Sequence, residues 1–419
     1  MQKADDQRQA LLGLTIEAVG QRGLGEFSLR NLATAAGLST TAIFQNFGSK
    51  AELLESALEL AIARDSAFHD ALRDPAARLL STHVSFADFL AHYILKRANS
   101  PLARFASEIL IGLDDYPGCH LLLQQWHAGR TDFWAAVLGK LDVQPGLARV
   151  VADYALMEEY YAYALHRECT YQLLLTETCR ALSDCAFHHG AAGPVLSHVS
   201  LNLGTQPMSI READDSSDAP IKEQLLEEAI RIIEDAGLEA LNQRRLARNA
   251  GVSSSAIAYY FKDMKTFRNR AIWRALVNGI PSQLDPEGYP VEQPSDLDQW
   301  LVTLEDLLDV GEDDRPAGFY IGFARLTAQA CLLSNHDCSL LPLVAYLREL
   351  EGWGTYRVSR NVAAQAELIG RDHAAAFGMW IKSEALLRRV NLTAPGTGIE
   401  RLEFAARHIF PERRSVGRD

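Results

Sequence analysis

The chain has 419 residues, of which 48% are hydrophobic and 23% charged, and it carries a formal net charge of −13. A chain of this length holds more than one domain and can bury substantial cores. No apolar run reaches the roughly 18 residues that span a bilayer, and the polar start at Met1 does not resemble a signal peptide. The acidic balance argues against a protein that coats nucleic acid, and we expect a cytoplasmic protein.

Two short helices separated by a glycine turn are expected between residues 28 and 50, after an amphipathic helix at 5–20 that braces them. Ser28 and Ser39 each stand where a hydroxyl can cap the start of a helix, and Gly37 stands where the chain must turn sharply. Small residues around a glycine turn, followed by a short helix with polar side chains, indicate a helix-turn-helix that enters a major groove.

The second of these helices exposes residues of the types that hydrogen-bond to base edges and phosphates. We predict base contacts by Thr40, Thr41, Gln45 and Asn46, and a phosphate contact by Phe44. Lys50 begins a further helix, where an ammonium and a helix N-terminus can share one phosphate. The residues predicted to bind DNA in this copy are Ser28, Arg30, Ser39, Thr40, Thr41, Phe44, Gln45, Asn46 and Lys50.

The same pattern occurs a second time, after a shift of 214 residues without a gap. Gly37 and Ile43 of the first copy correspond to Gly251 and Ile257 of the second. The match extends upstream into the bracing helix, so the repeated unit has three helices. This period is far too long for a solenoid, and it indicates a duplication at the scale of a domain.

Both copies resemble the N-terminal DNA-binding domain of the tetracycline-repressor (TetR) family of regulators. The first copy meets the whole family pattern between Gly37 and Lys50. The second departs from it at Ala258, where an aromatic residue is expected, and at Met264, where a lysine is expected. Because family proteins are dimers of chains about half this length, the resemblance implies two protomers fused head to tail. It implies a bacterial, ligand-responsive transcription regulator that acts as a repressor. Nothing in the sequence resembles a nucleophile elbow, a phosphate loop or paired catalytic carboxylates, so we expect no enzymatic activity, cofactor, metal or catalytic residue.

The second copy offers many cations for backbone contacts. Between Asn242 and Arg274 the chain holds eight Lys or Arg residues against a single acid, Asp263, and such a basic cap on an acidic body can grip phosphates in one orientation. An alternative is a protein-interaction scaffold in which one or both helix-turn-helix units no longer bind DNA. The residues predicted to bind DNA in this copy are Arg244, Arg245, Ser253, Ser254, Ser255, Tyr259, Tyr260, Lys262 and Lys265.

The expected fold class is all-α, with two units of the same plan and no alternating strand pattern of useful length. The predicted domains are a first DNA-binding domain at 1–50, a first helical regulatory body at 51–189, a linker at 190–220, a second DNA-binding domain at 221–265 and a second body at 266–419. Helices are expected near 51–70, 84–98, 101–113, 117–140, 146–167, 169–188, 266–278, 296–310, 316–333, 340–350, 356–390 and 397–410, with a break at Asp74-Pro75.

Each body is implied by the resemblance to serve in ligand sensing and pairing. The partners are then double-stranded operator DNA and a small apolar or aromatic effector, with no membrane. We expect the halves to pack as an intramolecular pseudo-dimer through 146–188 and 356–410, and a further homodimer is possible. Weak candidates for lining an effector site, which core packing explains nearly as well, are Tyr93, Phe105, Trp126, Trp134 and Tyr160.

The six cysteines lack the spacing of a disulfide framework, and we expect buried free thiols. Cys185, His188 and His189 could ligate a metal, but no second pair of ligands lies nearby in sequence, so a helix end with a polar tail is the favoured interpretation.

Overall fold

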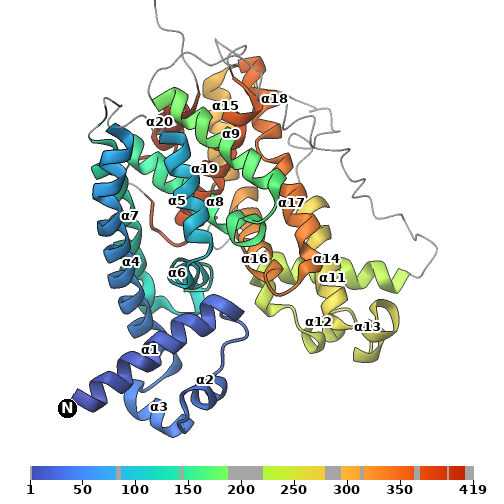
Figure 1. Ribbon diagram of the computed structural model, residues 1–419. Coiled ribbons are helices and arrows are strands. Elements are labelled where there is room, and N and C mark those ends of the chain that lie inside the picture. The colour runs from blue at the N-terminus through green and yellow to red at the C-terminus, as the bar shows by residue number, and fades with distance from the viewer. Residues whose placement is uncertain are drawn as a thin grey trace, which may run out of the picture.

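The computed structural model describes residues 2–81, 86–139, 141, 143, 146–186, 220–278, 294–311, 316–362, 369–393 and 396–410. Every regular element in these ranges is a helix, which confirms the all-α fold class (Figure 1). No helix within the described ranges is long and apolar enough to cross a membrane. The predicted linker lies outside the described residues apart from Pro220, and so do His188 and His189.

The first head comprises α1 (Gln2–Arg22), α2 (Leu29–Ala36) and α3 (Thr40–Phe47), as the sequence predicts. Burying an apolar stripe holds these short helices together, because helices of eight residues are unstable alone in water. Leu32 of α2 is 2% exposed, and Ile43 of α3 is 1% exposed.

The first body comprises α4 (Lys50–Ser81), α5 (Phe86–Ala98), α6 (Pro101–Ile111), η1 (Leu113–Asp115), η2 (Pro117–Cys119), α7 (His120–Leu138), α8 (Leu147–Leu165) and α9 (Cys169–Ala186). The predicted break at Asp74-Pro75 is wrong, because α4 continues through Pro75 to Ser81. A proline inside a helix removes one hydrogen bond and costs about 3 kcal/mol. Contacts of α4 with α1, α6 and α7, together with complete burial of Ala76, offset that cost.

The second head comprises α11 (Pro220–Ala236), η3 (Leu238–Ala240), α12 (Gln243–Asn249) and α13 (Ser254–Phe261). The second body comprises α14 (Met264–Asn278), α15 (Leu297–Leu307), α16 (Phe319–Ser334), η4 (Cys338–Leu340), α17 (Leu341–Leu350), α18 (Trp353–Val362), α19 (Arg371–Arg389) and α20 (Gly398–Ile409). The single helix predicted at 356–390 is wrong, since α18 and α19 are separate. Gly370 lies in extended conformation just before α19, and glycine weakens a helix interior.

Helices from the two halves pack directly on one another. In Figure 1, α8 and α19 lie at the centre of the molecule, and α19 contacts both α8 and α9. Further contacts join α8 to α16 and α17, and α9 to α20. Arg348 of α17 forms an ion pair with Glu158 of α8 at 3.0 Å, and both side chains are buried. The two heads lie at the same end of the molecule, with the bodies above them (Figure 1).

The cysteines are free thiols, but their burial differs from the prediction. Cys119, Cys179 and Cys331 are buried, whereas Cys169 and Cys338 are exposed. Cys169 is the first residue of α9 and Cys338 the first of η4, and helix starts commonly lie at the surface.

Candidate nucleic-acid interface

The turn of the first head is built by two serine caps and one glycine. Ser28 Oγ accepts a hydrogen bond from the Asn31 N–H at 3.2 Å, and Ser39 Oγ accepts one from the Ala42 N–H at 3.1 Å. Gly37 adopts φ 65° and ψ 32°, a left-handed conformation that favours glycine. These contacts satisfy N–H groups at both helix starts and fix the direction in which α3 leaves α2.

The outer face of α3 carries part of the predicted set. Thr41, Phe44 and Gln45 are exposed, Phe44 by 48%. Thr40 and Asn46 are half-buried, and the Asn46 amide donates to the Ala42 carbonyl at 2.7 Å. The structure therefore brings Thr41, Phe44 and Gln45 together on one free surface. Contact of any of these side chains with DNA stays a prediction.

Lys50 lies where the first head meets the first body. Its Nζ donates to the Phe27 carbonyl at 3.3 Å and stands 5.4 Å from the centroid of that ring. The same Nζ lies 5.9 Å from the centroid of the Tyr116 ring. An ammonium has three N–H groups, so a phosphate contact by Lys50 would use those that Phe27 leaves free.

Arg8 of α1 supports the reading helix, and the sequence interpretation did not single it out. Its Nη1 donates to the Asn46 carbonyl at 2.7 Å, and its Nη2 donates to Ser56 Oγ of α4 at 3.1 Å. The guanidinium also lies 4.5 Å from the centroid of the Phe47 ring. The 214-residue shift places Lys222 at the matching position, 5.9 Å from the Phe261 ring. Both copies of the repeat thus carry a cation at this position, and this shared feature of the sequence could have identified Arg8 as a functional candidate.

The second head repeats this geometry with different side chains. Asn242 caps α12 by accepting from the Arg245 N–H at 3.0 Å, and Gly251 adopts φ 65°, the same value as its counterpart in the first head. Ser253 does not cap α13 with its side chain, and its Oγ lies 2.8 Å from Ser255 Oγ. Tyr259 is 83% exposed, with its ring centroid 4.9 Å from that of half-buried Tyr260. Ser254 begins α13, but its side chain is outside the described set.

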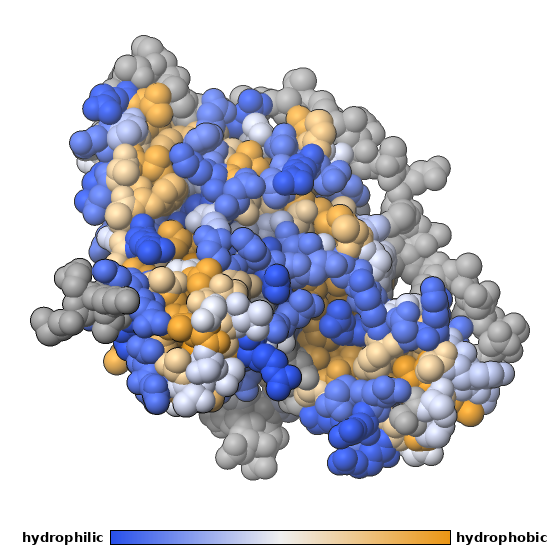
Figure 2. Space-filling model, turned by 60° about the horizontal axis from the view of Figure 1, so that its bottom comes forward, coloured by the Kyte–Doolittle hydropathy of each residue, from blue (hydrophilic) through white to orange (hydrophobic). Residues whose placement is uncertain are grey.

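Cations gather on the second head. Arg244 and Lys262 are exposed and Arg245 is half-buried. Lys265 is exposed but forms an ion pair at 3.4 Å with Asp337, the residue that caps η4. Figure 2 brings the head-bearing end forward, and hydrophilic residues gather at its lower right, over the second head. This distribution differs from that of the first head, where Arg30 and Lys50 are the cations among the predicted residues.

The family model described as "Bacterial regulatory proteins, tetR family" matches residues 11–57 and matches again at residues 225–270. Each head therefore contains a tetR-family DNA-binding domain. The two matches begin 214 residues apart, the same shift that relates the two heads. No curated protein sequence matches the chain. Two such domains in an all-helical chain make this protein a DNA-binding transcription regulator.

In this regulator each head is attached to a body through a glycine turn. Glu108 of α6 accepts from the Leu24 N–H at 3.1 Å and lies against Gly23, which has φ 82°. The corresponding Gly237, with φ 79°, meets the Arg325 guanidinium of α16 instead. The first head is thus held by a hydrogen bond to a carboxylate, whereas a guanidinium lies against the turn of the second.

Arg325 also links the second half to the first. Its Nη2 lies 3.3 Å from Asp114 Oδ2 of η1, and the same carboxylate pairs with Arg389 of α19 at 2.5 Å. A movement of α16 would therefore act both on the turn of the second head and on the first body.

The five aromatic residues predicted to line an effector site in this regulator all lie in the core of the first body, each at most 3% exposed. Trp126 Nε1 donates to Asp65 Oδ2 at 2.9 Å, and Tyr160 donates to the Ser107 carbonyl at 3.0 Å. Tyr93 and Trp134 pack edge to face with centroids 4.9 Å apart. A role for these residues in binding an effector stays a prediction.

Trp126 and Tyr93 lie beside a buried network of charged side chains. Arg97 pairs with Asp65 at 2.6 Å and with Glu159 at 2.9 Å, and Arg130 pairs with Glu159 at 2.8 Å. Burial alone would raise the pKa of Asp65, but Arg97, His69 and Arg130 together outweigh that effect and hold this pKa below its usual value. The network joins α4, α5, α7 and α8, so it ties the helix that follows the first head to the rest of its body.

Proposed function

We propose that this tetR-family regulator is a repressor that binds one operator with both heads at once and releases it when an effector binds a helical body. The observation that carries the proposal is that both heads lie at one end of a molecule whose bodies pack on each other (Figure 1). In this arrangement one chain presents two reading helices, as a symmetric dimer does.

The contacts between the bodies support the pseudo-dimer. Arg348 donates to both oxygens of Glu158, at 3.0 and 3.2 Å, and a bidentate pair fixes orientation as well as distance. Phe404 of α20 lies so close to Gly146 that a β-carbon at Gly146 would stand 2.3 Å from its ring. Such close packing between segments far apart in sequence favours one defined arrangement of the halves.

On the DNA side we propose that Thr40, Thr41, Gln45 and Asn46 read bases under the first head, with phosphates bound by Phe44 and Lys50. Under the second head we propose that the arginines and lysines bind phosphates, with Tyr259 and Tyr260 at the groove. The exposure of Gln45 and Tyr259 supports these roles, because a reading side chain must reach the base edges.

Fluorescence anisotropy of the purified full chain with DNA from upstream of its own gene tests the proposal. We expect specific binding that weakens as salt rises, because each phosphate contact releases counterions. A reporter gene behind the bound DNA should be silenced by the intact protein and expressed with a Gln45→Ala variant. Binding no tighter than to unrelated DNA would contradict the operator, and a reporter that rises with the intact protein would contradict repression.

A further inference from the structure

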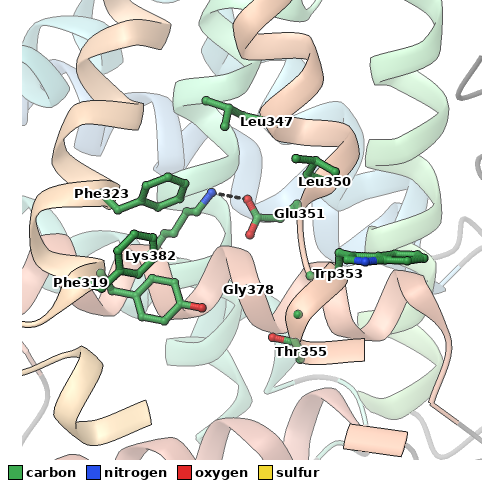
Figure 3. Close-up of a pocket in the computed structure, with 12 residues that line it drawn as sticks. Phe319, Phe323, Leu347, Leu350, Glu351, Trp353, Thr355, Gly378 and Lys382 are labelled. Carbon is green, nitrogen blue, oxygen red and sulfur yellow. Dashed lines mark hydrogen bonds and ion pairs between the residues drawn. The ribbon is translucent and has the colours of Figure 1, made fainter. Parts of the chain in front are cut away.

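A small cavity in the second body is walled by apolar side chains from α16, α17 and α18. Figure 3 shows Phe319 and Phe323 on one side and Trp353 on the other, with the Lys382–Glu351 pair between them. Leu347 and Leu350 close it from above in this view, and its volume is about 60 Å³. Sites for small organic molecules are mostly apolar and aromatic with a few convergent polar groups, and this cavity has that character.

The polar end of the cavity reaches the junction between the halves. Lys382 Nζ of α19 donates to Glu351 Oε2 at 2.5 Å and to the Tyr161 hydroxyl of α8 at 3.2 Å. Lys382 is 3% exposed and Glu351 is 7% exposed. The same ammonium lies 4.8 Å from the Phe323 ring centroid. A ligand that contacts this pair therefore also touches the contact between the two halves.

We propose that this cavity is the effector site of the second body and that its ligand is a neutral planar aromatic molecule carrying a hydroxyl group. The buried pair has no net charge, and adding an unpaired ion beside it would be costly. An ammonium has three N–H groups, and the hydrogen bonds described above use two of those on Lys382. The described hydrogen bonds to Glu351 go to Oε2. A phenolic group can accept from Lys382 and donate to Glu351 Oε1, which a carboxylate cannot do.

Because the cavity is small, we expect its walls to move when a ligand binds. Ligand sites commonly enclose about 300–1,000 Å³, so a ring enters this cavity only when its walls move apart. One wall is α16, which also carries Arg325. Because Arg325 contacts Gly237 of the second head and Asp114 of the first body, outward movement of α16 would alter how the heads are held. The effect on DNA rests on the proposed function, whereas binding to the cavity does not.

Calorimetry with the full chain free of DNA tests the site with three naphthalene probes that share one ring system. We expect 2-naphthol to bind at least about tenfold more tightly than 2-naphthoate or 2-naphthylmethylammonium, since each of these ions loses one of the two hydrogen bonds that the hydroxyl group makes to charged groups. The double variant Lys382→Met/Glu351→Gln keeps the site neutral and should weaken 2-naphthol by at least about tenfold. Trp300→Phe, in α15 of the second body and outside the lining of the cavity, is the matched control and should change its affinity less than about twofold.

A second variant guards against misfolding of the double variant. Phe323→Ala removes one aromatic wall and leaves the ion pair in place, and it should also weaken 2-naphthol. The proposal is overturned if 2-naphthol fails to bind at 1 mM, if 2-naphthoate binds equally well, or if Trp300→Phe abolishes binding while the cavity variants do not.

Separate measurement of DNA binding distinguishes the site from the proposed function. If the effector site and the operator are coupled, saturating operator should weaken 2-naphthol by the same factor by which 2-naphthol weakens operator binding. Cavity-dependent binding of 2-naphthol by a protein that never binds its upstream DNA would overturn the proposed function and leave the site standing. Operator release by 2-naphthol in the Lys382→Met/Glu351→Gln variant would overturn the site and leave the regulator standing.

Discussion

Gly48 and Lys262 occupy the same position in the two heads and share one backbone conformation, with φ and ψ of 71° and −54° in Gly48 and 70° and −53° in Lys262. Positive φ suits glycine but strains a residue with a β-carbon by about 1–3 kcal/mol. The second head therefore carries a strained lysine at the end of α13, where the first head has an unstrained glycine. A cation at this position offers a phosphate contact that the first head lacks.

We predict opposite effects on stability and DNA binding for Lys262→Gly. Relief of strain, less the entropy that glycine gives the unfolded chain, should stabilise the protein by about 1 kcal/mol. Loss of the ammonium should weaken binding to all DNA sequences and lower the salt slope by about one. Urea denaturation and anisotropy measure the two effects. Lys262→Ala keeps the strain and loses the charge, so it should weaken DNA binding equally without the gain in stability.

Gln45 is the sharpest test of base reading, because it is exposed on α3 while the amide of Asn46 is partly engaged with the helix backbone. Gln45→Ala should cost about 1–3 kcal/mol of operator affinity and relax the base preference at one position. Asn46→Ala should lower the operator affinity by no more than Gln45→Ala does. Gln124→Ala removes the same amide from the exposed face of α7 and should leave selection of operator sequences unchanged. An unchanged preference in the Gln45→Ala/Asn46→Ala double variant would refute the base contacts.

The buried network predicts a large loss of stability from a small change. Asp65→Asn leaves Arg97 without one of its carboxylates, and breaking a buried pair costs about 3–5 kcal/mol. Because the folded pKa of Asp65 lies below its unfolded value, its contribution is present above about pH 4 and is lost as pH falls further. Asp70→Asn is the control on the same helix, since its pair with Arg73 is solvent-exposed and should matter by less than about 0.5 kcal/mol.

His69 predicts a second pH dependence, in a different window. Burial, together with the nearby Arg97 guanidinium, lowers the pKa of His69 to about 3. In the unfolded chain His69 binds a proton near pH 6.5, whereas in the folded chain it stays neutral at that pH. The free energy of unfolding therefore falls as pH drops below about 6.5. Between pH 7 and pH 5 this group should account for about 2 kcal/mol. Denaturation curves of the wild type and His69→Gln should differ by that amount in their pH dependence, and parallel curves would contradict the assignment.

Local signals in the sequence predicted the heads almost to the residue. Ser28, Gly37 and Ser39 act through contacts three or four residues away, and the second head repeats the first cap at Asn242 and the glycine turn at Gly251. The breaks in the bodies are harder to predict, since α4, which continues through Pro75, packs against α6 and α7, and these lie far along the chain. The cavity could not be predicted, because it needs Tyr161 and Lys382, 221 residues apart, to meet across the two halves.

The unlike reading helices predict an asymmetric operator. One chain carries Gln45 and Asn46 in the first head against Tyr259 and Tyr260 in the second, so the two half-sites should differ in sequence while lying about 34–36 Å apart or a multiple of that distance. Under the first head we expect well-specified bases. Under the second, with Arg244 and other cations, we expect a looser site held mainly through phosphates.

Footprinting combined with light scattering on the complex measures this arrangement directly. One chain should protect two unlike half-sites, and base changes under the first head should cost more affinity than changes under the second. A duplex with two copies of the first half-site in palindromic order should bind one chain no more tightly than the natural operator. If two chains bind such a palindrome through their first heads and leave the second heads unprotected, the pseudo-dimer is wrong. The second head would then be a scaffold, since its exposed Tyr259 would face no base.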